Sequence, residues 1–478
     1  MRDRSPIHCV AHKEIREIVR DGRLRTLGAL VIILALTALA FGAHQTHRAQ
    51  DARAHARETA VSQWENQGEK NPHVAAHYGT HVFAPTSAAT AIDPGVSAHL
   101  GRAVKIEAHR RNLAGHTAAR DGAALQRLGD FSVATVLLLL IPLLIVALGY
   151  GLWSRERERG TLRQLLSTGV DPSALFWGKA IALATLVGAL LIPAALLILA
   201  ALWALGGGDA GTLLRLGLLG LSYGTYFVIF GALTLFASAT ARSSRGALVG
   251  LVGMWGVFCL IMPRAATEVS ATLNPLPSRA ELARRIDHSL EWGIDGETKR
   301  DPAIDAMVRD LMAEEGFANT GMMVDDTFLT GFELRAEARW EDAVYNHYVK
   351  ALNDQIAIQE SRVSWAGLVS PYVAMRALSA GLCGSDFAHH RHFTDYAEGW
   401  RQALVDRLNA TFAKRAGALG WDYRAGSELW KNSPPFTYQS PSAGFALRTH
   451  LVDVLSLLLW LALALGLAVG SARRVRAV

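Results

Sequence analysis

Six apolar stretches, each about long enough to cross a lipid bilayer, constrain this chain more than any other feature. A helix needs about 20 residues to cross the roughly 30 Å hydrocarbon core, and a spanning segment must satisfy its own backbone hydrogen bonds. The stretches therefore predict an all-α integral membrane protein with six transmembrane helices. These helices are predicted at residues 27–43, 132–153, 174–205, 213–239, 246–262 and 451–469.

The basic residues between these stretches are unevenly distributed, and this sets the predicted orientation. Residues 1–26, 154–173, 240–246 and 470–478 together carry 16 Lys and Arg against 7 Asp and Glu, whereas the rest of the chain carries 32 against 35. Cytoplasmic segments are the ones enriched in Lys and Arg, so both termini are predicted to be cytoplasmic, in a bacterial inner membrane. Topology and membrane lipid thus account for the basic excess, and no nucleic-acid partner is predicted.

The N-terminal segment, residues 1–26, predicts an amphipathic helix beside the first span. Ile7, Val10, Ile15 and Ile18 fall near one stripe, and basic side chains occupy the other face. Such a helix lies on the inner leaflet of the membrane. The region is long for the basic segment of a signal peptide, so we expect the first span to be retained rather than cleaved.

Two long segments, residues 44–131 and 263–450, are predicted to be extracytoplasmic and mainly α-helical. Helical periodicity is strongest over Phe332–Ser361 and returns over Thr394–Ala418. The apolar stretch Val363–Leu382 contains Pro371, and we predict here a helix that lies at the membrane face or packs in the outer domain, rather than a seventh span. A seventh span would place the basic C-terminal tail, residues 470–478, outside the cell.

Several function classes lack their sequence signatures. The chain contains no Gly-x-x-x-x-Gly-Lys-Ser/Thr loop, no His-Glu-x-x-His and no Gly-x-Ser-x-Gly. The predicted spans hold almost no ionisable residues, and Lys179 and Arg215 near their ends are predicted to extend to the interface. We therefore predict a protein that is not an enzyme, binds no cofactor itself and is not driven by an ion gradient. Its driving force would come from a cytoplasmic partner.

The segment between the second and third spans, residues 154–173, is the predicted receiver of that force. It combines a run of alternating charges with Gly160 and a short amphipathic helix. Leu162, Leu165 and Leu166 share one face of this helix, which could dock in a groove of a partner protein. A solvated cytoplasmic loop explains the charges as well, and the residues alone leave both interpretations open.

These residues resemble the coupling-helix region of ABC-2-type permeases, the membrane subunits of ATP-binding-cassette exporters. The resemblance is carried by Glu156-x-Glu158-x-Gly160-Thr161-Leu162, by Leu165-Leu166-Ser167 and by Gly178-Lys179. The run Lys13–Glu17 is similar to the connecting helix of the same family. The resemblance implies that residues 155–164 contact a separate ATPase subunit, which would bind ATP and Mg²⁺. It assigns coupling to Glu156, Glu158, Gly160, Thr161, Leu162 and Leu165, and implies a homodimer or a heterodimer with a second permease.

The large outer segments are similar to a large-loop branch of the same superfamily. Three motifs carry this similarity: Asn71-Pro72-His73-x-x-Ala76-His77-x-Gly79, Gly384-Ser385-Asp386-x-x-His389-His390 and Ser433-Pro434-Pro435. This similarity does not identify the transported substrate. A periplasmic partner for the outer domain is a further expectation.

Histidines in the outer segments form two candidate metal sites. His73, His77 and His81 are spaced by four residues, which would align them on one helical face suited to Zn²⁺ or Cu²⁺. His389, His390 and His392 form the second group. Packing and helix capping are the alternative roles, because no cysteine or carboxylate completes either set and Gly79 weakens the helix.

The sequence thus predicts a permease subunit of an ATP-binding-cassette transporter, with export favoured over import. The alternative is a membrane-anchored interaction or assembly protein, whose outer domain binds a partner without any transport.

Overall fold

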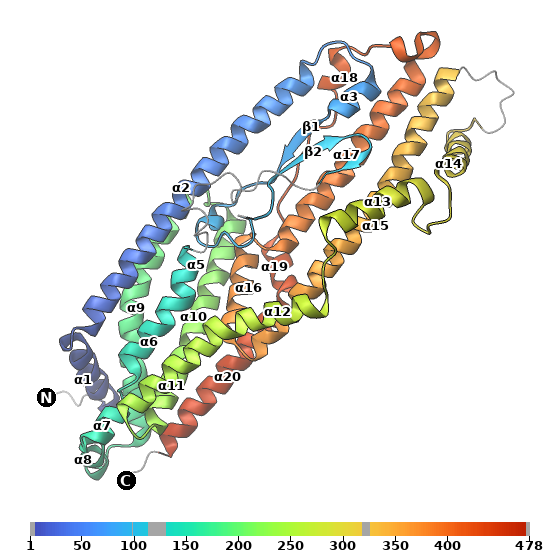
Figure 1. The fold of residues 1–478 in the computed structure, drawn as a ribbon. Helices are drawn as coiled ribbons and strands as arrows, with labels where there is room; N and C mark the ends of the chain where they lie inside the picture. Colours follow the sequence, from blue (N-terminus) through green and yellow to red (C-terminus); the bar gives the residue numbers. More distant parts are fainter. Residues whose placement is uncertain (1–4, 98, 113–130, 318–325, 475–478) are drawn as a thin grey trace.

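The computed structural model describes residues 5–97, 99–112, 131–317 and 326–474, which form an elongated helical molecule (Figure 1). Both ends of the chain lie at the same end of the molecule. Parts of both predicted outer segments and of the two termini fall outside the described residues.

Six helices of the described chain are long and apolar enough to cross a membrane, and each overlaps one predicted stretch over nearly its whole length. The second combines α5 (Val133–Thr135), a π-helical turn η3 (Val136–Leu140), α6 (Ile141–Gly149) and α7 (Ser154–Glu158). The fifth combines α11 (Ser244–Gly256), a π-helical turn η4 (Val257–Ile261) and α12 (Met262–Leu273). The others are α2 (Arg23–Glu65), α9 (Pro172–Ala204), α10 (Ala210–Thr240) and α20 (Leu451–Arg473).

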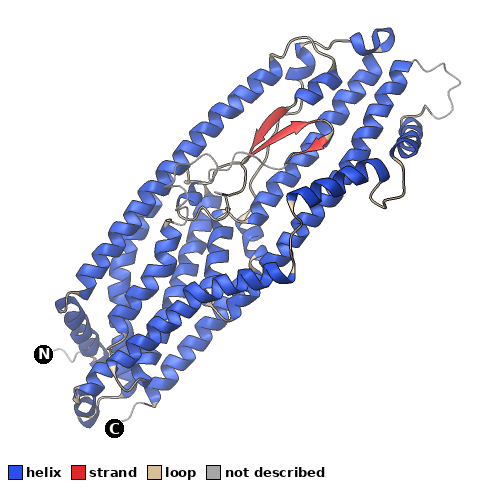
Figure 2. Cartoon of the chain, viewed as in Figure 1, coloured by secondary structure: helices blue, strands red, loops and turns tan. Residues whose placement is uncertain are grey.

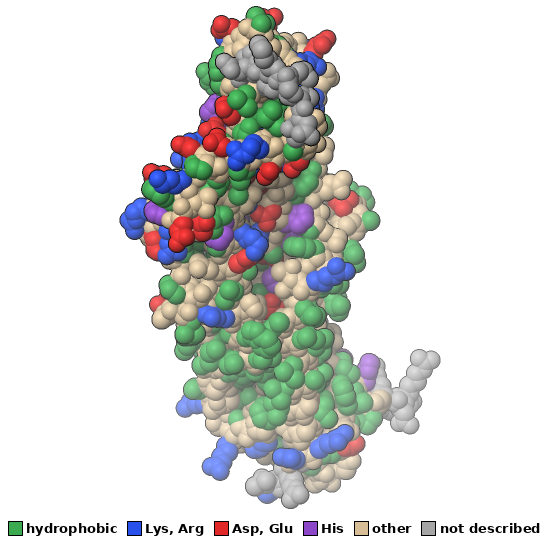
Figure 3. Space-filling view, turned by 90° about the vertical axis from the view of Figure 1, so that its right-hand side faces the viewer, with side chains coloured by type: hydrophobic (Ala, Val, Ile, Leu, Met, Phe, Trp, Pro, Cys, Tyr) green, Lys and Arg blue, Asp and Glu red, His purple; other side chains and the backbone are tan. Residues whose placement is uncertain are grey.

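The surface of the molecule divides into zones along its length. In Figure 3, hydrophobic side chains form a band on the lower half, with Lys and Arg below it and charges of both signs above. Large exposed apolar side chains contribute to this surface, among them Ile192, Leu221, Val249 and Leu459. An exposed apolar band between charged zones is the surface of a protein that sits in a bilayer.

The core of the bundle is built around α10. This helix buries Tyr223, Tyr226 and Phe230 and packs most extensively against α20. Each π-helical turn ends two residues before a proline, Pro142 or Pro263, which cannot donate a backbone hydrogen bond. In the second span the carbonyl of Leu138 accepts instead from the Tyr226 hydroxyl, at 2.9 Å. Side chains of neighbouring helices therefore replace backbone hydrogen bonds lost inside the bundle.

Several helices continue well beyond the apolar band. The 43 residues of α2 correspond to about 64 Å, roughly twice the thickness of the hydrocarbon core. The predicted first span ended at residue 43, so the first quarter of the expected outer loop is instead a continuation of this helix. It is joined at the outer end by α13 (Arg279–Trp292), α14 (Arg300–Glu314), α15 (Asp326–Trp365) and α17 (Phe387–Arg415).

The predicted helices of the second outer segment are confirmed, with shifted ends. Helix α15 contains Phe332–Ser361, and α17 covers most of Thr394–Ala418. The stretch Val363–Leu382 divides at Ser370, and its second part forms α16 (Pro371–Cys383). With 13 residues, α16 is too short to span a bilayer, and it packs against α10 and α20. The remaining short helices are α18 (Ser427–Lys431) and α19 (Ala443–Thr449).

A small antiparallel sheet in the first outer segment was not predicted (Figure 2). It has the order β1 (Thr80–Phe83), β2 (Ala103–Glu107) and β3 (Arg110–Arg111), and follows the short helix α3 (Pro72–Tyr78). Val104 and Ile106 are buried against α17, whereas Lys105 between them is not. These strands are four, five and two residues long, too short for alternation to stand out in the sequence. The described part of this segment is therefore mixed rather than mainly helical.

Candidate functional site

The segment between the second and third spans folds into two short helices, at the end of the molecule that holds both termini (Figure 1). They are α7 and α8 (Thr161–Ser167), and they meet at Gly160. Gly160 has a φ of 72°, a left-handed conformation that glycine adopts without steric cost. The chain turns at this residue, so that α8 packs back onto the bundle.

Buried ion pairs connect α7 to α9 and to α1 (Pro6–Arg20). The carboxylate of Glu156 pairs with Lys13 of α1 and, at 2.8 Å, with Lys179 of α9. Lys179 is fully buried, and its ammonium group also pairs with Glu14 at 2.5 Å and donates to the carbonyl of Leu152 at 2.7 Å. Two carboxylates thus neutralise two ammonium groups, which makes the burial of these charges tolerable. We call Lys13, Glu14, Glu156 and Lys179 the ion cluster.

The rest of the charged run ties α7 to the junction of α10 and α11. Arg157 donates to the carbonyls of Ala239 and Ala241, both at 2.6 Å, where α10 ends. Glu158 accepts from the backbone N–H and the hydroxyl of Ser244, at 2.9 and 2.6 Å, where α11 begins. Each charge has the sign that the neighbouring helix dipole favours. Helix α7 therefore joins four helices: α1, α9, α10 and α11.

The predicted coupling residues divide into inward-facing and outward-facing ones. Leu162 is 2 % exposed and packs in the bundle core, with Leu165 partly buried beside it. Thr161 is partly exposed, and its hydroxyl donates to the carbonyl of Glu156 at 3.3 Å, whereas Glu158 and Gly160 lie at the surface. The apolar face of α8 is therefore occupied by this protein itself, whereas one of the two interpretations that the sequence left open placed it in a groove of a partner. The exposed face of α8 is polar and consists of Arg163, Gln164 and Ser167.

Helix α1 crosses α9 at a glycine. A Cβ on Gly178 would lie 2.6 Å from the Val10 side chain and 3.0 Å from the carbonyl oxygen of Ile7. Only glycine permits this approach, which brings Glu14 within reach of Lys179. Beside the crossing, a hollow of about 340 Å³ separates α1 from α8; its lining includes Lys13, Glu17, Arg159 and Gln164.

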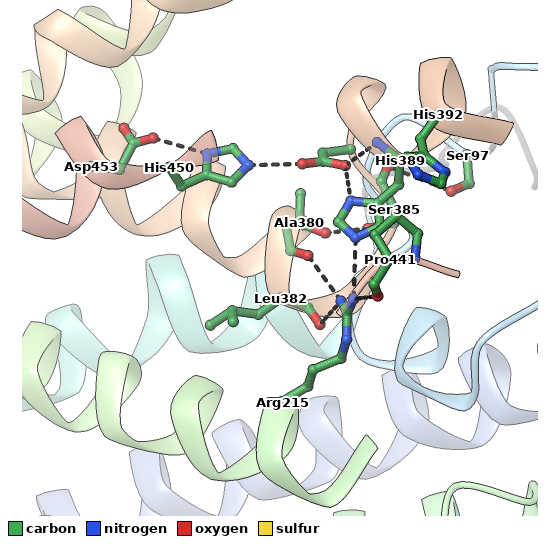
Figure 4. Close-up of polar contacts among 12 residues, drawn as sticks. Ser97, Arg215, Ala380, Leu382, Ser385, His389, His392, Pro441, His450 and Asp453 are labelled. Carbon is green, nitrogen blue, oxygen red and sulfur yellow. Dashed lines mark hydrogen bonds and ion pairs between the residues drawn. The ribbon is translucent and has the colours of Figure 1, made fainter. Parts of the chain in front are cut away.

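A second polar network links the outer ends of the spans to the outer domain (Figure 4). Asp386 caps α17 by accepting from the His389 backbone at 2.9 Å, and its carboxylate bonds the His389 ring at 2.5 Å and the His450 ring at 2.8 Å. His450 in turn contacts Asp453 at 3.0 Å. From α10, Arg215 donates to the carbonyl of Leu382 at 3.1 Å and contacts the His389 ring at 3.3 Å. The chain of contacts therefore runs from α10 through α17 to α20.

The positions of three ionisable residues differ from the sequence-based description of the spans. Lys179 and Arg215 were predicted to extend to the interface, yet both turn into the protein and find partners there. Asp453, in the first turn of α20, is fully buried and was overlooked. The signals available were its position inside an apolar stretch and His450 three residues before it.

The histidines of the first outer segment come together in a different combination from the predicted one. His73 and His77 lie on α3 as expected, but His81 lies exposed on β1. The third ring in the group is His109, from the turn between β2 and β3, and one nitrogen from each ring lies within 4.8 Å of the others. Burial lowers the pKa of His73 to about 4, although its hydrogen bond to Asn409 opposes this effect.

In the part of the chain that the structure describes, the second histidine group does not converge on one point. His389 binds Asp386, whereas His392 contacts the hydroxyl of Tyr438 at 3.0 Å. His390 is partly buried, and its ring lies near Phe387. These residues stabilise the outer domain through separate contacts, as in the alternative role of packing and capping.

The fold and the sites together define a class, a multi-pass helical membrane protein with an ion-paired junction of helices at one end and a large folded domain at the other. The chain belongs to the ABC-2 family of transporter proteins, whose family model matches residues 8–475. The resemblance seen in the sequence is thereby confirmed over nearly the whole chain. Membership makes the protein a membrane component of a transporter and implies an ATP-binding-cassette ATPase as partner. A comparison with curated proteins found no match.

Proposed function

We propose that this protein is the permease subunit of an exporter in a bacterial inner membrane, moved by a separate ATPase that binds ATP and Mg²⁺. Two permease subunits, either identical or of two kinds, would sit on two ATPase subunits. Both termini and α8 would face the cytoplasm, and the domain around α15 and α17 would face outward.

The observation that carries this proposal is the junction formed by α7. Glu156 of α7 pairs with Lys13 of α1 and with Lys179 of α9. Arg157 binds the end of α10, and Glu158 binds the start of α11. A force applied to α8 reaches α7 through two residues, Arg159 and Gly160, and is passed from there to four helices at once. The short, ion-paired contacts supply a rigid connection, since they leave little freedom for one helix to move without the others.

The contact surface for the ATPase is proposed to be the polar face of α8 together with the adjoining hollow. Arg163, Gln164 and Ser167 project from α8, and Arg159 and Glu17 line the hollow beside it. This assignment keeps the coupling segment where the family resemblance puts it. The proposed contact residues are the exposed charged and polar residues of this segment, not its leucines, which pack against the bundle.

Co-purification tests the proposal directly. The chain would be expressed with a candidate P-loop ATPase from the same organism, captured through a C-terminal tag, and assayed for bound ATPase and for ATP hydrolysis. Reversing the charge of α8 with Arg163→Glu should reduce the bound ATPase at least about tenfold, because a charged contact at an interface centre is worth about 2 kcal/mol or more.

The matched control is Arg309→Glu, the same reversal at an exposed position of α14 in the outer domain. It should leave the bound ATPase unchanged. Equal losses in both variants, or no effect of Arg163→Glu on binding and hydrolysis, would show that α8 is not the contact surface. Failure of any ATPase to co-purify would favour a membrane-anchored interaction protein instead.

A further inference from the structure

Three imidazole rings from separate parts of the first outer segment face one another at the edge of the outer domain. His73 and His77 come from the two ends of α3, and His109 comes from the β2–β3 turn. The Nε2 atoms of His73 and His77 are 3.0 Å apart, and the His77 and His109 rings stack at 4.7 Å between centroids. A tetrahedral ion with metal–nitrogen distances of about 2.0–2.1 Å needs nitrogens roughly 3.3 Å apart, close to the distance between His73 and His77.

Two of the rings are held by partners on their far sides. The Nδ1 of His73 lies 2.9 Å from Oδ1 of Asn409, and the Nδ1 of His109 lies 2.7 Å from a carboxylate oxygen of Glu341. An amide or carboxylate oxygen can only accept, so both Nδ1 atoms carry a proton, and in the neutral ring each Nε2 atom carries the lone pair. Metal-ligating histidines are oriented in this way by outer carboxylates and carbonyls.

The partners are themselves fixed by the outer domain. The side-chain N–H₂ of Asn409 donates to the carbonyl of Leu334, at 3.4 Å, which orients its oxygen toward His73. Asn409 lies on α17 and is 1 % exposed, and Glu341 lies on α15. The two long outer helices therefore position rings that belong to the first outer segment.

The backbone around the rings is shaped for their approach. His109 has a φ of 62°, and it is the only non-glycine residue with positive φ in the described chain. Such a conformation costs free energy, and it persists at sites where a side chain must take a particular position. The preceding residue, Ala108, donates its backbone N–H to the carbonyl of Ala76 on α3, at 2.9 Å. At Gly79 a Cβ would lie 1.8 Å from the carbonyl oxygen of Ile106, so only glycine lets α3 pack this closely against β2.

We propose that His73, His77 and His109 form a binding site for a divalent transition-metal ion, Zn²⁺ or Cu²⁺. Imidazole nitrogen suits both ions. His73 is buried, His109 is partly buried and His77 is exposed, so the site opens to solvent on one side. Three protein ligands with an open fourth position allow water or an exchangeable ligand to complete the coordination. The bound ion would join α3 to the β2–β3 turn and, through Asn409 and Glu341, to α17 and α15.

Calorimetry on the purified, metal-stripped full chain in detergent tests this site, with ZnCl₂ and CuCl₂ titrated separately. One ion should bind per chain. Two variants each remove one ligand: His77→Ala, at an exposed position, and His109→Asn, which keeps a residue type tolerant of positive φ. Each should weaken binding more than about 100-fold, since even loss of an outer partner typically costs 10–100-fold.

The matched control is His81→Asn, which removes the histidine that sequence spacing alone would have chosen. It should leave affinity and stoichiometry unchanged. Glu341→Gln keeps an oxygen for the His109 ring but removes the charge, and it should weaken binding about 10-fold.

Cobalt provides a readout that does not depend on affinity. Co²⁺ bound by three imidazoles and water should give visible absorption bands, which His77→Ala abolishes and His81→Asn retains. Circular dichroism of each metal-free variant verifies that it is folded. No binding of either ion by the folded wild-type chain, or equal binding by the folded His109→Asn variant, would overturn the proposal.

Discussion

At the scale of single residues, the charges of this protein are placed where a second charge can neutralise them. Lys179 lies within an apolar helix and is fully buried, yet three acceptors surround its ammonium group: Glu14, Glu156 and the carbonyl of Leu152. His450 at the outer side is likewise held between Asp386 and Asp453. Removal of one partner from such a group leaves the others buried and unpaired, which costs more than the pair itself contributes.

Replacing Lys179 by methionine should therefore destabilise the protein strongly. The change Lys179→Met keeps most of the side-chain volume but leaves the buried carboxylates of Glu14 and Glu156 with only one ammonium group, that of Lys13. The expected loss is about 3–5 kcal/mol, seen as a lower apparent unfolding temperature in detergent. The control Lys350→Met alters an exposed i,i+4 pair on α15 and should cost less than about 0.5 kcal/mol. Equal effects of the two substitutions would contradict the role assigned to the ion cluster.

The pair of Asp386 and His450 should make stability depend on pH. Burial lowers the pKa of His450, but its hydrogen bonds to Asp386 and Asp453 outweigh this effect and raise it from 6.5 to about 9. A raised histidine pKa means that the stabilisation is complete below pH 6.5 and is lost as pH rises through about 9, a change of about 3 kcal/mol. The pKa of Asp386 is lowered by His389 and His450 in spite of burial, so its contribution disappears only in acid.

Unfolding temperatures measured between pH 6 and pH 10 would check this dependence. The variant His450→Gln should be less stable at pH 6 and should lose the decline toward pH 9. The control His392→Gln changes a histidine that contacts Tyr438 outside this network and should keep the decline. Glu360 lies near Asp386 and His450, and Glu360→Gln measures its separate contribution to the curve. A decline that persists in His450→Gln would assign the titration to another group.

At the scale of elements, short helices at the end of the molecule that holds the termini act as connectors between long ones. Helix α1 is amphipathic as predicted, but its inward face lies on α9, which buries Ala11, Glu14 and Ile18. Helix α7 has only five residues and is stabilised by its contacts with α1, α9, α10 and α11 rather than by its own hydrogen bonds. Loss of one contact surface should therefore loosen a connector without unfolding the spans.

The crossing of α1 and α9 offers a test with a small substitution. In Gly178→Ala the new methyl group would meet Val10 at 2.6 Å, which should force α1 outward at a cost of about 1–3 kcal/mol. Limited trypsin digestion should then cut faster at Arg16 and Arg20 of α1. In the control Gly188→Ala on the same helix, the nearest heavy atom lies at 3.8 Å, so cleavage should stay slow. Unchanged cleavage in Gly178→Ala would mean that α1 does not depend on this contact.

At the scale of the whole molecule, the chain has two ends of different character, separated by the apolar band (Figure 3). The termini, α7 and α8 lie at one end, and α3, the sheet and the outer halves of α2, α15 and α17 lie at the other (Figure 1). The uneven distribution of Lys and Arg predicts that the end with the termini is cytoplasmic. The helices that run past the band provide a continuous connection from one end to the other.

Native cysteines make this orientation measurable. Cys9 is exposed near the N-terminus, whereas Cys259 and Cys383 are buried. A membrane-impermeant maleimide added to intact spheroplasts should leave the wild-type chain unlabelled, and opening the membrane should expose Cys9. The variant Cys9→Ser with Ser427→Cys, at an exposed position of α18, should be labelled without opening the membrane. The reverse pattern would place α8 outside and remove the basis for coupling to an ATPase.

Much of the candidate site could be located in the sequence, but its contacts could not. The charged run of residues 154–159, Gly160 and the family pattern indicated the coupling segment, because local spacing and charge carry that signal. The pairing of Glu156 with Lys13 and Lys179 joins residues 143 and 23 positions apart, and no local pattern encodes it. The same limit explains why His81 was predicted as a metal ligand and His109 was not. A spacing of four residues can predict ligands on one helix, but it cannot predict a histidine that a distant β-turn brings to the site.

The sequence by itself determined the membrane-embedded class, the six apolar helices and the family, because hydrophobic length and charge asymmetry act on each segment independently of the others. Only the tertiary structure decided that the leucine face of α8 is buried, that Lys179 and Arg215 turn inward, and that three histidines converge. These outcomes depend on which helices become neighbours. Packing of distant segments, rather than composition, selects the partner of each buried charge and each ring.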